Sequence, residues 1–257
     1  LSRDAVSMAQ AFGAAGYRTG YIGKWHLDGH GRSAFTPPQR RQGFQFWRAL
    51  ECTHGYNRSP YYGDTPEKRI WDGYDALAQT REAQRFLREQ RASDPFLLVL
   101  SWGPPHNPYE TAPEEFRRRY RPQDIALRPN VPPAAAAQAS RDLAGYYAHC
   151  SALDACLGTL LRSLDDLGLA DDTLVVFTSD HGDMLGSHGE QRKQRPYDES
   201  IRVPFLLRLP ARRGRTGRAL DLPLNVPDIL PTLLGLCGLT IPETVEGTDF
   251  SRVLAGE

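Results

Sequence analysis

The stretch PFLLVL at residues 95–100 decides the fold class of this 257-residue chain. Its apolar residues are continuous rather than alternating, which is the pattern of a strand buried on both faces. Strands of this kind occur in parallel sheets that helices cover on both sides. The stretch therefore predicts an α/β fold with a mostly parallel sheet sandwiched by helices.

Helical and extended patterns alternate outward from this strand. Helices are predicted over residues 2–15, 72–90, 138–167 and 225–236 from apolar residues at helical spacing. Strands are predicted over residues 17–25, 173–178 and 204–209. Residues 26–64, dense in Gly, Pro and aromatics, are expected to form a long irregular excursion over the surface. This alternation of helices and strands is typical of an α/β sheet.

Composition excludes several classes of protein. Lysine plus arginine and aspartate plus glutamate both number 31, so the chain lacks the basic field of a general nucleic-acid binder. No apolar run approaches the roughly 20 residues that cross a bilayer. The four cysteines have no zinc-ligand spacing and are interpreted as buried free thiols. They are Cys52, Cys150, Cys156 and Cys237.

The loops that follow the predicted strands hold the candidate functional residues. In α/β sheets, ligands bind beyond the carboxyl ends of the strands, which selects the loops after residues 25, 102 and 179. Chemistry-bearing side chains lie in or soon after these loops. They are Lys24, His26, His106, Asp180, His181 and Lys193.

Each candidate has a functional and a plain interpretation. Adjacent Asp180 and His181 can share one divalent cation, although two ligands do not complete a site. In the plain interpretation, the carboxylate caps a turn and the imidazole is solvated. Two of only three lysines, Lys24 and Lys193, lie near strand ends, where an ammonium can bind a phosphate or sulfate oxygen. Both could instead be surface lysines, as Lys68 is expected to be.

Histidines supply the candidate acid–base groups. His26 and His106 could donate a proton or a hydrogen bond to an oxyanion. His149 lies inside the predicted long helix and is interpreted as a helix-face histidine, whereas His188 could face the site. No G-x-S-x-G elbow, P-loop or G-x-G-x-x-G motif occurs in the sequence.

Two motifs carry a resemblance to a known family. GYRTGYIGKWHL at residues 16–27 resembles the second signature of the type I sulfatases, and TSDHGDMLG at residues 178–186 resembles that family's metal-binding strand end. Residues 105–108 and 193–204 follow in the family's order, so the resemblance spans nearly the whole chain. It implies the alkaline-phosphatase-like α/β sandwich. The Asp-His form of the second motif also resembles the iduronate-sulfatase and phosphonate monoester hydrolase branches.

The resemblance implies hydrolysis of a sulfate ester. It implies a divalent metal ion, Ca²⁺ in the first place and Mn²⁺ or Mg²⁺ as alternatives, with Asp180 and His181 among its ligands. Lys24 and Lys193 would hold sulfate oxygens. Cationic groups and a metal suit the transition state of such a displacement. The implied substrate is a small-molecule or carbohydrate sulfate ester.

The resemblance also implies a formylglycine nucleophile, whose hydroxyl His26 would bond, while His106 would protonate or hydrogen-bond the leaving alcohol. The family's nucleophile motif, C/S-x-P-S-R, does not occur in the sequence, and no paired aspartates follow an N-terminal strand. Cys52 has neither Pro nor Arg at the needed offsets. We therefore expect residues 1–257 to be the central and C-terminal part of a single catalytic domain, truncated at both ends.

The sequence leaves three functions open. The parent protein is expected to be a sulfatase, with this chain alone inactive. A phosphonate monoester or phosphodiester hydrolase of the same superfamily is the second hypothesis, since the same cationic groups serve either anion. A non-catalytic fragment that binds a metal or an anion is the third. The compartment, bacterial cytoplasm or periplasm, and the oligomeric state stay open.

Overall fold

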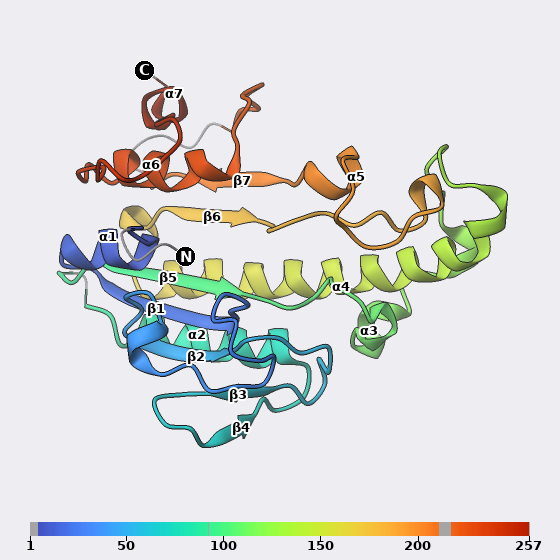
Figure 1. The fold of residues 1–257 in the computed structure, drawn as a ribbon, viewed down its shortest axis with the longest axis horizontal. Helices are drawn as coiled ribbons and strands as arrows, with labels where there is room; N and C mark the ends of the chain where they lie inside the picture. Colours follow the sequence, from blue (N-terminus) through green and yellow to red (C-terminus); the bar gives the residue numbers. More distant parts are fainter. Residues whose placement is uncertain (1–4, 92, 211–216, 257) are drawn as a thin grey trace.

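The computed structural model describes residues 5–91, 93–210 and 217–256. Within these ranges the strands form two sheets (Figure 1), one with the order β4-β3-β2-β1-β5 and one that pairs β6 with β7. The strands are β1 Arg18–Lys24, β2 Phe46–Leu50, β3 Pro60–Tyr62, β4 Lys68–Ile70, β5 Phe96–Ser101, β6 Val175–Thr178 and β7 Phe205–Arg208. The three central strands β2, β1 and β5 run parallel. The pairs β2–β3, β3–β4 and β6–β7 are antiparallel.

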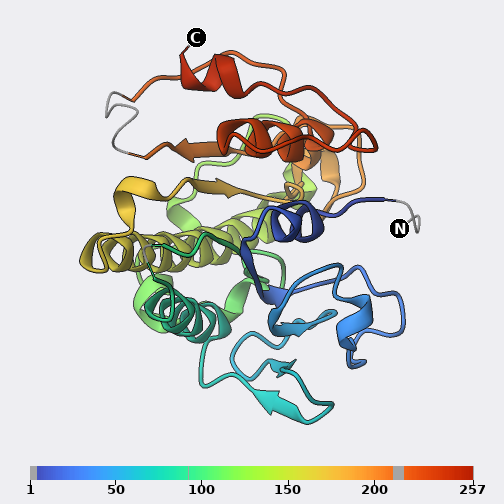
Figure 2. The ribbon, with the colours of Figure 1, turned by 90° about the vertical axis from the view of Figure 1, so that its left-hand side faces the viewer.

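Helices cover both faces of these strands. They are α1 Met8–Ala14, α2 Asp75–Arg88, α3 Glu114–Arg117, α4 Pro133–Asp166, α5 Asp198–Ile201, α6 Val226–Leu236 and α7 Ser251–Ala255. Short 3₁₀ turns are η1 Pro38–Arg40, η2 Tyr109–Thr111, η3 Pro122–Asp124, η4 Ala170–Asp172 and η5 Ser187–Gly189. Helices α2 and α4 lie on one face, and α1 and α6 lie on the other (Figure 2). The predicted α/β sandwich is confirmed. In the described ranges no helix combines the length and apolarity of a membrane span.

The alternating side chains of β5 explain its continuous apolar sequence. Leu97 packs against the cluster that α1 and α6 form around Phe12 and Leu234. Leu98 and Leu100 point to the opposite face and pack against α2 and α4. Helices therefore pack on both faces of the strand, but its residues are half-buried rather than buried as the sequence predicts.

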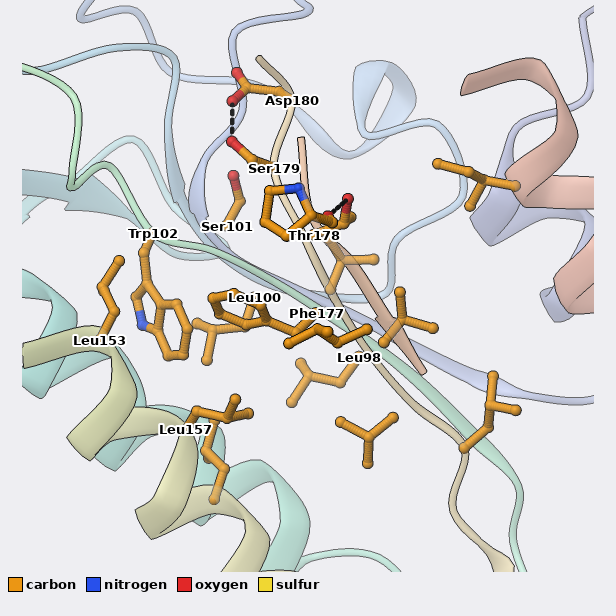
Figure 3. Close-up of a pocket in the computed structure, with 18 of the residues that line it drawn as sticks. Leu98, Leu100, Ser101, Trp102, Leu153, Leu157, Phe177, Thr178, Ser179 and Asp180 are labelled. Atoms are coloured by element: carbon orange, nitrogen blue, oxygen red, sulfur yellow. Dashed lines mark hydrogen bonds between the residues drawn. The ribbon is translucent and has the colours of Figure 1, made fainter. Parts of the chain in front are cut away.

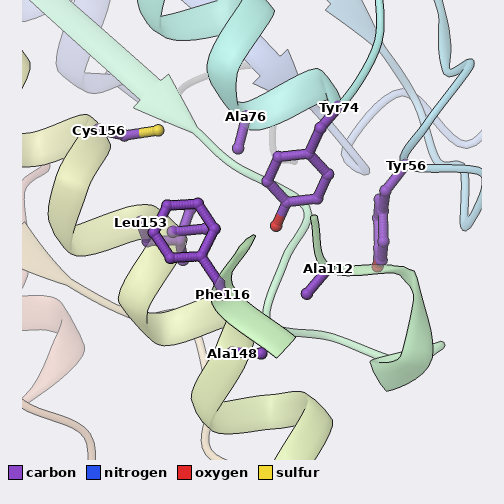
Figure 4. Close-up of a cluster of buried hydrophobic side chains, with 9 residues drawn as sticks. Tyr56, Tyr74, Ala76, Ala112, Phe116, Ala148, Leu153 and Cys156 are labelled. Carbon is purple, nitrogen blue, oxygen red and sulfur yellow. The ribbon is translucent and has the colours of Figure 1, made fainter. Parts of the chain in front are cut away.

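Outside the sheet, a second apolar cluster fixes the loops above the strand ends to α4 (Figure 4). Tyr56, Tyr74 and Phe116 pack there against Ala148 and Leu153 of α4. The long helix thus anchors the loop after β2, the start of α2 and the segment after β5. These connections hold the strand-end loops in place.

Several sequence predictions needed correction. The stretch at residues 26–64 is not an irregular excursion throughout, because it contains η1, β2 and β3. The first helix begins at Met8 rather than residue 2, since Ser7 and Gln10 form a reciprocal capping box there; residues 1–4 lie outside the described ranges. The long helix begins at Pro133, five residues earlier than predicted, with proline in its first turn.

The prediction that the four cysteines are buried is wrong for two of them. Cys52 and Cys156 are buried, whereas Cys150 is exposed and Cys237 is half-buried.

Candidate active site

The carboxyl ends of β1, β5 and β6 open onto one cavity of about 1390 Å³. Lys24, His106, Asp180 and His181 line it together with apolar side chains of β5, β6 and α4. Figure 3 shows Ser101, Ser179 and Asp180 beyond the apolar side chains of the groove, such as Leu98, Leu100, Leu157 and Phe177. Residues of all three predicted loops therefore line the same cavity.

The apolar part of this cavity is a groove between β5 and β6. Among the described residues, β5 is hydrogen-bonded only to β1, and β6 only to β7. The side chains of β5 are accordingly only half-buried along the whole strand. The groove therefore leaves two strand edges without partners, and unpaired edges of this kind are templates for a further strand.

A lysine–histidine contact lies at the polar part of the site. Lys193 Nζ is 2.5 Å from His106 Nε2, and His106 Nδ1 is 3.1 Å from the carbonyl oxygen of Asn107. Because a carbonyl only accepts, Nδ1 carries the proton and Nε2 accepts from the lysine ammonium. Burial, with Lys193 and Lys24 nearby, lowers the pKa of His106 to about 4. The imidazole is therefore neutral at pH 7.

The two lysines are close enough to repel each other. Partial burial and the charge of Lys24 lower the pKa of Lys193. An anion between two ammonium groups removes that repulsion and gains charge-assisted hydrogen bonds. The predicted pair of anion-binding lysines is thus brought together, whereas Lys68 lies exposed on β4.

Asp180 and His181 present two donors in an arrangement that suits a cation. His181 Nδ1 is 2.7 Å from the carbonyl oxygen of Gly182, so this nitrogen is the donor. Its Nε2 then turns a lone pair toward Asp180 Oδ2, 3.5 Å away. A histidine whose other nitrogen donates to a backbone carbonyl is a common feature of metal sites. The pair fits part of a divalent site. The described part of the chain contains no group of three or more His, Cys, Asp or Glu side chains that could hold a metal ion.

Backbone packing fixes the loop that carries Asp180 and His181. The Gly182 amide donates to Ser200 O over 2.8 Å, and a Cβ on this glycine would lie 2.0 Å from Glu199 O. Asp183 accepts from the Tyr109 hydroxyl over 2.7 Å and from the Leu185 amide over 3.2 Å. The Tyr109 bond joins the loop after β5 to the loop after β6.

The structure does not bring every candidate into contact. His26 is exposed, has a left-handed φ of 55°, and is not among the described residues that line the cavity. His188 stacks on Tyr197 at 4.1 Å and contacts Asn130. His149 is fully buried and bonded to Tyr74, so it is a structural histidine as predicted. The predicted role of His26 at the nucleophile stays a prediction.

Two residues at this edge were missed by sequence reasoning. His54 stacks on His106 with ring centroids 4.9 Å apart and an interplanar angle of 16°. Glu51 Oε1 accepts from the amides of Asp28 and Gly29 and so holds the loop after His26. Both follow β2, whose carboxyl end lies beside that of β1. Recognition of β2 as a parallel strand would have selected them.

The family model of the sulfatases matches residues 1–239. The chain belongs to the sulfatase family. An ulvan-active sulfatase of Formosa agariphila is 47% identical over 258 residues, covering 99% of this chain and 50% of that protein. The chain spans about half the length of the curated relatives it matches most strongly.

Solved structures agree on the architecture. The crystal structure of yidJ from Bacteroides fragilis, described as a sulfatase, superposes with a TM-score of 0.91 at 30% identity and covers 100% of this chain and 61% of that one. The phosphonate monoester hydrolase of Agrobacterium radiobacter has a TM-score of 0.77 at 22% identity over 100% of this chain and 63% of its own. The second likeness shows a shared fold alone.

Proposed function

We propose that the protein containing these residues hydrolyses sulfate esters of a carbohydrate. The observation that carries the proposal is the contact of Lys193 Nζ with His106 Nε2, beside Lys24, at a sheet edge that also presents Asp180 and His181. Membership of the sulfatase family and the relative named for activity on ulvan support the same substrate class. A site with these groups combines anion binding with proton transfer.

The chain's own residues divide the work by their chemistry. Lys24 and Lys193 bind the sulfate oxygens and stabilise the negative charge that develops on them. His106 hydrogen-bonds the leaving oxygen. Because its Nε2 accepts from Lys193, the proton closest to that nitrogen is on the lysine, and His106 takes a proton at Nε2 before it donates one. Truncating either lysine should lower kcat/KM.

Asp180 and His181 would hold a divalent cation, with Ca²⁺ proposed first. Such a cation, when bound, supplies positive charge that polarises the sulfate. The chemistry of the two donors, one carboxylate oxygen and one imidazole nitrogen, is compatible with this ion. Further ligands are proposed to come from parts of the protein outside these 257 residues.

The nucleophile, a formylglycine in this proposal, also comes from outside these residues. The groove between β5 and β6 is its proposed route, because a strand paired with either edge would end beside Ser101 and Asp180. The sequence of the whole protein tests this directly. Paired aspartates after a hydrophobic strand and a C/S-x-P-S-R motif are expected. A whole protein with neither motif would instead support a non-catalytic domain that binds a metal or an anion.

The choice between sulfatase and phosphonate monoester hydrolase needs matched substrates. The whole protein should be assayed on 4-nitrophenyl sulfate and on the 4-nitrophenyl monoester of phenylphosphonate, which share one leaving group. We expect the higher kcat/KM on the sulfate ester. A higher kcat/KM on the phosphonate ester would overturn the proposal and favour the alternative hydrolase.

A further inference from the structure

A second group of basic side chains lies beside the sulfate-binding lysines and takes no part in the chemistry described above. His54, in the loop after β2, stacks on His106 and is exposed on its outer side. The same His106 ring contacts Lys193 Nζ through its Nε2, so His54 lies one ring away from a proposed sulfate-binding group. A substrate that reaches His106 through its leaving oxygen therefore brings its sugar close to His54.

Arg32 lies against the same loop. Its Nη2 is 3.3 Å from Cys52 Sγ, and its carbonyl oxygen accepts from the Cys52 amide over 3.0 Å. A thiol is a weak, neutral partner, so it leaves the guanidinium charge uncompensated. Arg32 is exposed and free to bind a second partner.

Arg192 is the third basic residue of this group. It directly precedes Lys193, and its carbonyl oxygen accepts from the Met184 amide over 2.6 Å at a left-handed φ of 66°. Arg192 is exposed. The pKa of His54 is lowered by burial first and then by Arg32, Lys24, Lys193 and Arg192. These charges are all positive, so the field at His54 favours an anion.

We propose that Arg32, His54 and Arg192 form a second anion subsite, which binds an acidic group on the saccharide that carries the scissile sulfate. The inference rests on the proposed function and names the substrate class more closely: a polyanionic saccharide rather than one with a single sulfate. Guanidinium groups bind carboxylates and sulfates in fork geometry, so the acidic group is a uronate carboxylate or a second sulfate ester.

The test separates binding at this subsite from turnover. The whole protein is titrated with three disaccharides while saturating inorganic sulfate is present. One disaccharide is neutral, one contains a uronate, and one carries a single sulfate at a position that the protein does not hydrolyse. The variants are Arg192→Ala and Arg32→Ala, with Arg58→Ala as the control. Arg58 is an exposed arginine in the same loop as His54.

We expect wild type to bind one acidic disaccharide at least about 10-fold more tightly than the neutral one, as one charged hydrogen bond would give. Arg192→Ala and Arg32→Ala should remove that preference, and Arg58→Ala should keep it. The ligand that is preferred identifies the acid as carboxylate or sulfate. Equal binding of all three disaccharides by wild type, or an unchanged preference in both variants, would overturn the subsite.

Turnover of 4-nitrophenyl sulfate is measured in parallel, because it reports the proposed function alone. We expect Arg192→Ala and Arg32→Ala to stay within about twofold of wild type on this substrate, which carries no second acid. Loss of turnover in every protein, wild type included, would reject the sulfatase proposal without touching the binding result. His54→Gln, which keeps a hydrogen-bonding group but not the imidazole ring, should weaken the same preference.

Discussion

Replacing Gly182 with alanine should disable the proposed metal site while leaving the fold intact. A Cβ at this position would lie 2.0 Å from the carbonyl oxygen of Glu199, where real Cβ contacts are at least 3.0 Å. The difference, 3.0 − 2.0 Å, requires a shift of at least 1.0 Å between the loop and α5. The Gly182 carbonyl accepts from His181 Nδ1, so the shift moves the neighbouring imidazole.

The size of the effect follows from metal geometry. Ligand distances in metal sites hold to about ±0.2 Å, so a 1.0 Å displacement is about five times the tolerance. Loss of a supporting contact around a metal ligand typically weakens affinity about 10- to 100-fold. Overpacking of this kind also lowers the free energy of unfolding by about 1–3 kcal/mol. We expect both effects in Gly182→Ala.

The assay is calorimetric titration of the metal-free whole protein with Ca²⁺, then with Mn²⁺ and Mg²⁺. Gly217→Ala is the matched control, because a Cβ there meets no atom of the described residues within 4 Å. Thermal unfolding of each variant reports whether the fold is kept. A Gly182→Ala protein that binds the cation as tightly as Gly217→Ala would refute the reasoning, as would a wild type that binds none of the three ions.

Three further predictions concern the same scaffold. Burial raises the pKa of Asp75 from 3.8 to about 7, so the free energy of unfolding of wild type should fall by about 4 kcal/mol as pH rises from 4 to 8. In denaturant titrations Asp75→Asn should remove this fall, and an unchanged dependence of stability on pH would contradict the assignment. Tyr109→Phe removes the bond to Asp183 and should cost about 1.5–3 kcal/mol of unfolding free energy, whereas Tyr147→Phe, on an exposed tyrosine, should cost little. The 257-residue chain alone should associate through its unpaired edges at β5 and β6 and should not hydrolyse an aryl sulfate; a monodisperse monomer in ultracentrifugation, or turnover that Lys24→Ala abolishes, would count against this.

The fold could be predicted wherever the pattern of apolar side chains along the sequence reflects which residues pack against helices. Residues 96–100, which form most of β5, are continuously apolar because helices pack on both faces of that strand. Strand β2 was missed because polar Arg48 lies within it and its flanks are rich in Gly and aromatics. Its extended form depends on pairing with β1, a contact that no local pattern records.

The candidate site was predictable in its residues but not in all its contacts. Lys193 lies well beyond the end of β6, and the bond of the Met184 amide to Arg192 O folds that segment back to His106. The position of a loop after a strand does not reveal that a later segment folds back in this way.

His54 was missed together with β2, since a lone histidine in a glycine-rich loop carries no signal of its own. His26 kept the predicted loop position, although its exposed, left-handed geometry gives it no partner in the described ranges.

The central claim is that Lys24 and Lys193 hold the sulfate that is cleaved. Its most direct test is kcat/KM of the whole protein on 4-nitrophenyl sulfate for Lys24→Ala and Lys193→Ala, with Lys68→Ala as the exposed control. Removing one charge-stabilising donor from such a site costs about 10²- to 10³-fold in rate. We predict a fall of at least about 100-fold for each of the first two variants and a change within about twofold for Lys68→Ala. Wild-type kcat/KM in Lys193→Ala would contradict the claim.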